Sequence, residues 1–362
     1  MVDITFSAAI FIGGPTRPEI TSKSVTSLNN QTYSSLQKIL VNGSGYSLSI
    51  INSLGLNLAG WEIVNFPVDT FVRSEVFSLH RWPGQAALRI STGNFFFTMN
   101  DDDFLELDFF ERMAILFRKY PHAVTGIGLP ASYFHESKQI VHRKSRENDW
   151  RTRPECESGL DLIKKHLSGK YPFYNPNPGF QFVSKTDLVR DVADTFFSTG
   201  GFPEDSFVQV AMRGDTVFDK DAIMYWGRHK GQEHFDKTYD HYWYGIYRRM
   251  FDTYINVNSE IASRFLLNPA ELQKYLKNYH RKYLVSITLD CISLQLHLGA
   301  RFRRTKFYNP YAAKSSGMKF PWILHLSSLL RNPLFVIQNI YLRLRDSINY
   351  TRYGTAVSRN FD

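Results

Sequence analysis

An α/β fold followed by a separate helical region is the architecture that this sequence predicts. Short apolar runs of strand length alternate with helical patterns near the N-terminus: Phe6 to Ile12 ends at a Gly-Gly-Pro turn, Glu19 to Asn30 has helical spacing, and Leu36 to Val41 is a second strand. Strand, helix and strand in this order are typical of the start of a βαβ unit. After residue 238 the composition becomes helical, aromatic and basic, so we expect two domains, 1-238 and 239-362.

The rest of the first domain continues the alternation. A polar and charged stretch from His135 to Arg153 predicts a loop and a candidate mobile lid, and Pro203 with the two following acids predicts a helix start. The other expected elements are strands at Trp61 to Pro67, Asn94 to Met99, Ala123 to Ile127 and within Phe173 to Ser184, and helices at Gln85 to Ser91, Leu107 to Tyr120 and Thr186 to Phe197.

Composition indicates a globular protein of the cytoplasm. Apolar residues make up 43% of the chain and aromatic residues 15%, which is enough for a packed core. The two cysteines, Cys156 and Cys291, stand in no metal-binding or disulfide pattern, so a reducing compartment is expected. The N-terminus has no secretory signal pattern, and no apolar run of membrane-spanning length occurs.

Positive charge is concentrated in the C-terminal third. The chain carries a net charge of +9, and from Arg248 to Asp362 there are 18 Lys/Arg against 6 Asp/Glu. Apolar helical stretches beside Arg331 and Arg343 either pack on the first domain or a second subunit, or rest on an anionic membrane face. Both interpretations stay open. A basic, tyrosine-rich region also permits a nucleic-acid-binding function, although we expect no nucleic-acid partner.

An acidic run follows the most apolar strand of the first domain. Asn94 to Met99 leads directly into Asn100-Asp101-Asp102-Asp103, and open α/β sheets bind ligands just beyond the carboxyl ends of their strands. Carboxylate oxygens are suitable ligands for a divalent cation that neutralises a diphosphate. The alternative is a solvated acidic turn or a helix cap.

Taken together, these pieces resemble the family-2 glycosyltransferases. The resemblance rests on Gln31-Thr32-Tyr33 at the turn before the second strand, on the block from Gly84 through Gly93 to the acidic run, and on Gly200 to Gly214 with its Glu-Asp pair. It covers roughly residues 4 to 235. It implies a GT-A type, Rossmann-like nucleotide-binding sheet with flanking helices.

The resemblance also implies a catalytic base. Inversion at the anomeric carbon requires a base that takes the proton of the acceptor hydroxyl. By the family pattern this base is Asp205, with Glu204 beside it as orienter or second candidate. The alternative is that the two acids only stabilise a helix N-terminus.

Metal and nucleotide contacts follow from the same resemblance. By the resemblance, the family's metal-binding aspartate falls on Asp102, with Asp103 as its helper. A shift of one residue would use Asp101 and Asp103 instead. His229 in a later basic loop is a further metal candidate, and His234 competes with it. Implied nucleotide contacts are Gly13, Asn42, Arg89, Asn100, Asp101 and Arg228, with Asn42 in place of the acid usual in the family.

The predicted function is an inverting transfer of a sugar from a nucleotide-diphosphate sugar to an acceptor hydroxyl, with Mn²⁺ or Mg²⁺ as cofactor. A glycan or glycolipid acceptor, in cell-surface polysaccharide or lipopolysaccharide synthesis, is implied by the family alone. The expected location is the cytoplasm, with peripheral contact at the inner membrane face as an option for the C-terminal region. The rival is a catalytically silent relative that binds a carbohydrate or nucleotide, because Asn42 and Asn100 replace family aspartates.

Overall fold

Most of the first domain is described in the computed structural model. The described residues are 3–12, 17–43, 48–65, 83–141, 153–162, 182–191, 210–229 and 337. The chain divides into two compact units, Met1–Lys164 with Phe173–His229, and Lys165–Pro172 with Lys230–Asp362. Apart from Ile337, every described residue belongs to the first unit. The predicted boundary after residue 238 and the predicted C-terminal helical region lie outside the described residues.

The first half of the sheet is parallel and is built from the predicted strand and helix alternation. Apolar runs form its strands because burial on both faces selects continuous apolar sequence. Strand β1 pairs in parallel with β2 on one side and β4 on the other, and β2 pairs in parallel with β3. The elements are β1 (Phe6–Ile12), α1 (Pro18–Asn29), β2 (Leu36–Asn42), α2 (Leu48–Ser53), β3 (Trp61–Asn65), α3 (Pro83–Ile90) and β4 (Phe95–Asn100).

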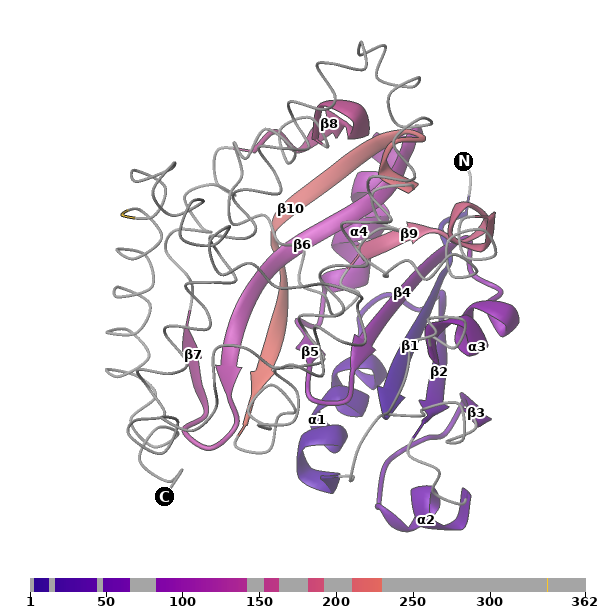
Figure 1. Cartoon of the computed structure of the whole chain (residues 1–362), viewed down its shortest axis with the longest axis vertical. Coiled ribbons are helices and arrows are strands. Elements are labelled where there is room, and N and C mark those ends of the chain that lie inside the picture. Colours follow the sequence, from indigo (N-terminus) through magenta and orange to yellow (C-terminus); the bar gives the residue numbers. More distant parts are fainter. Residues whose placement is uncertain are drawn as a thin grey trace, which may run out of the picture. The chain divides into compact units, whose positions relative to one another are not determined.

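The second half of the sheet is mixed, yet its two long strands run in the direction of β4. Strand β9 (Phe182–Lys185) is antiparallel to both β4 and β6 (Ala123–Phe134), so β4 and β6 point the same way. Strand β10 (Asp215–Arg228) is parallel to β6. The sheet has the order β3-β2-β1-β4-β9-β6-β10-β5, where β5 is Phe104–Leu105, and the arrowheads of β1, β4, β6 and β10 share one edge in Figure 1. This confirms the predicted α/β fold.

Two long strands were predicted incompletely or not at all. Strand β6 continues past the predicted end at Ile127, although Pro130 lacks a backbone donor. Strand β10 was not predicted, because its apolar residues are interrupted by the polar triplet from Asp219 to Asp221. The register between the two strands shifts between Asp219 and Ile223, opposite Gly128 and Leu129. This bulge lets a polar triplet stand inside a strand without ending the pairing.

The segment predicted as a loop from His135 begins as a hairpin instead. Strand β7 (Gln139–Val141) pairs antiparallel with the end of β6, from Ser132 to Phe134. Residues 136 to 138 form the turn, and Lys138 has a positive φ of 54° there. The prediction of a loop was therefore wrong for 139–141, while the remainder of the predicted lid, 142–152, lies outside the described residues.

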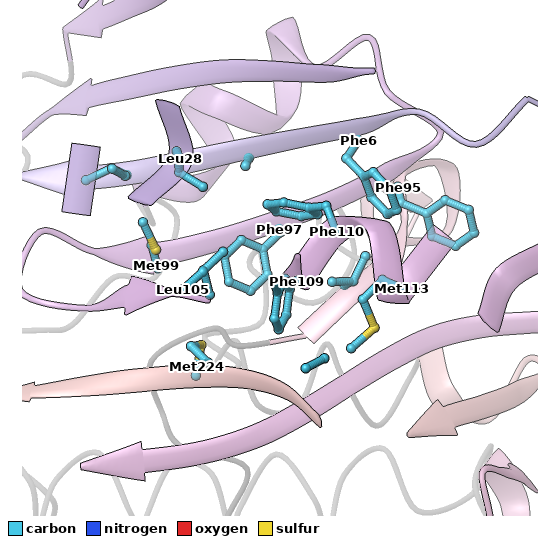
Figure 2. Packing of buried hydrophobic residues seen from close by; sticks show 14 of the residues in the cluster. Phe6, Leu28, Phe95, Phe97, Met99, Leu105, Phe109, Phe110, Met113 and Met224 are labelled. Carbon is cyan, nitrogen blue, oxygen red and sulfur yellow. The ribbon is translucent and has the colours of Figure 1, made fainter. Parts of the chain in front are cut away.

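A phenylalanine-rich core joins the sheet to helix α4 (Phe109–Lys119). The helix buries one face, which includes Phe109, Phe110 and Met113, against side chains of β1 and β4 (Figure 2). Phe95 of β4 stacks on Phe117, with 3.8 Å between ring centroids. Each fully buried aromatic side chain contributes about 1.5–3 kcal/mol through burial. This packing anchors the strand that leads into the acidic run.

Gly93 allows the start of β4 to lie directly against β1. A Cβ at this position would stand 2.4 Å from the carbonyl carbon of Phe6 and 2.6 Å from the nitrogen of Ser7. The Gly93 N–H also donates to Ser7 Oγ at 2.8 Å, and the Gly93 carbonyl accepts from Thr186 Oγ1 at 2.6 Å. Because the atoms nearest to such a Cβ belong to the backbone of β1, they cannot move aside as a flexible side chain could.

Gly93→Ala is therefore expected to destabilise the first unit by about 3 kcal/mol, at the upper end of typical overpacking costs. The measurement is the free energy of unfolding from urea titration. Thr92→Ala, at the neighbouring exposed residue, is the control and should change little. An unfolding midpoint for Gly93→Ala equal to that of the control would contradict the close approach.

Candidate active site

Four segments meet at the carboxyl edge of the sheet because β1, β4, β6 and β10 all end there. Arg17 follows β1 and begins α1, and the acidic run follows β4. His135 follows β6, and His229 follows β10. Residues far apart in the sequence are thus placed together, as expected for ligand sites of open α/β sheets.

The carboxylate of Asp102 lies beside His229. Asp102 Oδ2 and His229 Nε2 are 3.3 Å apart, and both side chains are largely buried. The guanidinium of Arg17 hydrogen-bonds to Nδ1 of the same imidazole. Both contacts are satisfied by the neutral tautomer in which Nδ1 accepts from Arg17 and Nε2–H donates to Asp102. Cation, imidazole and carboxylate therefore form a chain of three groups.

His135 contacts Asp102 from the other side, through the main chain. Its Nε2 lies 3.0 Å from the carbonyl oxygen of Asp102, and its ring centroid is 6.0 Å from that of His229. Burial lowers the pKa of His135, while the hydrogen bond to the Asp102 carbonyl opposes this effect. No spacing pattern in the sequence links this histidine to the acidic run, and only the structure brings the two together.

Asp101 turns toward helix α1 instead. Thr21 Oγ1 lies 3.5 Å from its Oδ2, and Ser24 Oγ donates to its carbonyl oxygen at 2.8 Å. Burial, followed by the nearby charge of Asp102, raises the pKa of the Asp101 carboxyl to about 7. In this arrangement the Asp101 side chain contacts Thr21 of α1, whereas the Asp102 side chain faces His229.

The raised pKa of Asp101 makes stability depend on pH. Between about pH 4 and pH 7 the unfolded chain loses this proton while the folded chain retains it, so stability should fall as pH rises. Asp101→Asn should reduce this loss by on the order of 1–3 kcal/mol. The measurement is urea unfolding at pH 4 to 7 in chelator. Equal pH slopes in both proteins would contradict the assignment.

Asp103 is the most buried of the three acids. Its Oδ1 accepts from the Gly227 N–H at 3.0 Å, and its Oδ2 is buried without a hydrogen-bond partner among the described residues. Burial, followed by the charge of Asp102, raises the pKa of Asp103 well above its usual range. In this structure Asp103 therefore joins β4 to β10 through Oδ1, and its metal-binding role stays a prediction.

Arg228 lies at the end of β10, near the buried acids. Its guanidinium carbon is 4.0 Å from the ring centroid of Trp226, two residues earlier on the same strand face. Its charge lowers the pKa of Asp103, against the larger effect of burial. The predicted nucleotide contact thus stands at the correct edge of the sheet, adjacent in sequence to His229.

The two asparagines predicted as nucleotide contacts also end strands at this edge. Asn42 closes β2, is buried, and donates from Nδ2 to Asn65 Oδ1 at the end of β3, at 3.0 Å. Asn100 closes β4, and its carbonyl accepts from the Asp103 N–H at 3.3 Å. Asn100 therefore closes the backbone turn that carries the acids.

Arg89 lies at the opposite edge of the sheet, a position that does not favour its predicted nucleotide contact. It is exposed in the last turn of α3, next to Ile90, whose carbonyl accepts from Gln37 Nε2 at 3.0 Å. Gln37 stands near the amino end of β2. Because α3 feeds into the start of β4, its last turn lies a strand length away from the acidic run at the other end of β4.

The predicted base and one predicted nucleotide contact lie outside the described residues. These are Asp205, Glu204 and Gly13. The proximity of Glu204 and Asp205 to Asp102 therefore stays a prediction.

The carboxylate of Asp102 is the candidate cation ligand, and His229 could join it only by exchanging its present hydrogen bonds. The described part of the chain contains no group of three or more acidic, histidine or cysteine side chains suited to hold a metal. Magnesium, however, is commonly held by only one or two carboxylates, with substrate phosphates and water completing its shell. Asp102 supplies one such carboxylate. His229 would supply an imidazole ligand once its proton moves from Nε2 to Nδ1 and Arg17 turns away from Nδ1.

Comparison with known proteins identifies the fold. No protein-family model and no curated protein matches the chain. The crystal structure of S. aureus TarS 1-349 is similar over 97% of this chain and 90% of that chain, with a TM-score of 0.50 and 13% identity. TarS 1-349 in complex with UDP-GlcNAc is similar over 78% of this chain and 73% of that chain, with a TM-score of 0.45 and 13% identity.

A longer TarS structure has a TM-score of 0.47 and 13% identity over 78% of this chain, which spans 44% of its length. TarS is a family-2 glycosyltransferase with a GT-A-like fold. At this identity the similarity shows the fold, and the predicted GT-A type architecture is confirmed.

Proposed function

We propose that this chain, which has the GT-A fold, is an inverting glycosyltransferase that moves a sugar from a nucleotide-diphosphate sugar to an acceptor hydroxyl. The observation that carries the proposal is the cluster of Arg17, Asp102 and His229 at the carboxyl edge of the sheet. TarS, which shares the fold, is known in complex with UDP-GlcNAc, and this supports a nucleotide-sugar donor for the present chain.

The charges at this edge suit a diphosphate leaving group. Arg17 and Arg228 supply positive charge from two strand ends, and Asp102 with His229 would hold Mn²⁺ or Mg²⁺. When bound, the cation would neutralise negative charge on the departing diphosphate. Burial of Asp102 and His229 strengthens these electrostatic interactions, because partial exclusion of water lowers the local dielectric constant.

The acceptor proton requires a separate base. In the proposed mechanism Asp205 removes this proton on the face of the sugar opposite the diphosphate. Glu204 orients the Asp205 carboxylate. Asp101 and Asp103 are unsuited to stand in for this base, since each makes its hydrogen bonds to the protein, to α1 and to Gly227 respectively. Support for Asp205 comes from the family motif that ends at Gly214.

The acceptor and the cellular location belong to the proposal as well. We propose a glycan or glycolipid acceptor of cell-surface polysaccharide or lipopolysaccharide synthesis and a cytoplasmic enzyme that touches the inner membrane face through its C-terminal region. Within the described residues, no helix combines the length and apolar character needed to cross a membrane.

The test is a panel of nucleotide-diphosphate sugars, assayed with Mn²⁺ or Mg²⁺ for release of nucleoside diphosphate. We expect turnover with at least one donor, loss of turnover in chelator, and a loss of about a hundredfold or more in Asp205→Asn, within the usual range for removal of a general base. Turnover that persists in chelator and in Asp205→Asn would reject the mechanism. Donor binding without turnover would instead identify a silent relative.

A further inference from the structure

We propose that His135 is a positioning residue for Asp102, which it holds through a hydrogen bond from Nε2–H to the main-chain carbonyl of Asp102. The proposal rests on the proposed function for its consequence in catalysis. The contact itself, at 3.0 Å, joins the end of β6 to the acidic run after β4. These two segments are separated in the sheet by β9, so no strand pairing connects them.

The turn that carries Asp102 is also held at its two neighbours, by Ser24 Oγ on the Asp101 carbonyl at 2.8 Å and by the Gly227 N–H on Asp103 Oδ1 at 3.0 Å. Asp103 N–H to the Asn100 carbonyl, at 3.3 Å, is a long hydrogen bond. The side chain of Asp102 is turned toward His229, at 3.3 Å. A donor on the Asp102 carbonyl therefore restricts the rotation of the peptide unit and, with it, the direction of the carboxylate.

His135 is itself rigidly held, which a positioning residue requires. Its backbone N–H donates to the Arg228 carbonyl at 2.9 Å, which ties it to the end of β10. Its ring stands edge to face against Tyr133, with 5.1 Å between centroids and an interplanar angle of 88°. Tyr133 is buried and packs edge to face on Phe104, while Lys23 Nζ lies 3.3 Å from its ring centroid. These contacts fix the position of the His135 imidazole, and with it the position of Nε2.

Gly227 provides the space for this contact. A Cβ at Gly227 would stand 1.8 Å from the Asp102 carbonyl oxygen and 2.8 Å from His135 Nε2. The Gly227 N–H meanwhile binds Asp103 Oδ1 at 3.0 Å. One residue without a side chain therefore allows the imidazole, the Asp102 carbonyl and strand β10 to meet.

The hydrogen bond requires only a proton on Nε2, which both the neutral Nε2–H tautomer and the cation carry. Loss of this donor would leave the fold intact but let the Asp102 carboxylate change direction. Partners that orient a metal ligand typically contribute 10- to 100-fold in metal affinity or activity. We expect an effect of about that size at His135.

A matched pair of variants isolates the donor. In His135→Gln the side-chain amide reaches about as far as Nε2 and can donate, whereas His135→Met has similar length and no donor. With a donor sugar that the wild type uses, His135→Met should raise the metal concentration for half-maximal rate, or lower kcat/KM, by about 10- to 100-fold. His135→Gln should recover most of this loss, and both variants should unfold at the same temperature within a few degrees.

Hydrogen exchange tests the contact without any activity. Amides of the peptide that covers Asn100 to Phe104 should exchange faster in His135→Met than in the wild type, and at wild-type rates in His135→Gln. If the wild type turns over no nucleotide sugar but this pattern holds, the proposed function fails while the contact stands. Unchanged exchange and unchanged metal dependence in a folded His135→Met protein would overturn the proposal, as would equal losses in both variants.

Discussion

Asp102→Asn is expected to lower the rate of sugar transfer by about a hundredfold or more. The substitution preserves the size of the side chain but removes the negative charge that faces His229 at 3.3 Å. A loss of about 3 kcal/mol in transition-state stabilisation, typical for removal of one charged group from such a site, corresponds to a factor of this size. The measurement is kcat/KM for the nucleotide sugar at saturating Mn²⁺ or Mg²⁺.

Asp108→Asn is the matched control for this charge change. Asp108 is partly exposed, and its carboxylate pairs with Arg112 four residues later in α4, at 2.6 Å. Because surface ion pairs contribute little, about 0–1 kcal/mol, activity should be unchanged within a factor of two or so. If Asp102→Asn retained activity close to that of Asp108→Asn, the metal-binding role of Asp102 would be excluded.

Gly227→Ala is expected to destabilise the first unit by about 3 kcal/mol or more and to abolish most activity. The new methyl group would lie 1.8 Å from the carbonyl oxygen of Asp102 and 2.6 Å from its carbonyl carbon, so backbone must move. Overpacking against mobile side chains costs about 1–3 kcal/mol, and a clash with backbone belongs at or above the top of that range. The displaced backbone is that of the acidic run, which couples stability to activity.

Unfolding in urea and kcat/KM, measured on the same samples, test this prediction. Lys220→Ala is the control, since Lys220 lies on the same strand with an exposed side chain. It should behave like the wild type in both measurements. A Gly227→Ala protein with wild-type stability and activity would mean that β10 and the acidic run are farther apart than the structure places them.

The parallel half of the sheet was predictable because its signals are local. Phe6–Ile12 and Phe95–Asn100 are apolar over nearly their whole length and end at turn-forming or acidic residues, and this pattern determines a buried strand almost alone. Strand β10 escaped prediction because its interruption, Asp219 to Asp221, is tolerated only through a bulge beside β6. A tertiary pairing overrode the local signal there.

The candidate site was predictable only in part, for the same reason. The acidic run could be located from the strand before it, but the three carboxyls could not be told apart by their spacing. Their roles differ because Thr21 and Ser24 face Asp101, His229 faces Asp102, and Gly227 faces Asp103. Arg89, in turn, lies at the other edge of the sheet, and the motif match did not predict this because it carries no information about which edge a residue occupies.

The sequence by itself determined the α/β class, the order of the first strands and helices, and the placement of carboxylates at a strand end. Only the tertiary structure decided what lies beside each acid and which of their pKa values burial raises. Arg17 and His229 are 212 positions apart, and His135 reaches Asp102 only because β4, β6 and β10 end at one edge. Local sequence patterns report burial and turns, whereas strand order across a sheet brings distant residues together and changes their pKa values.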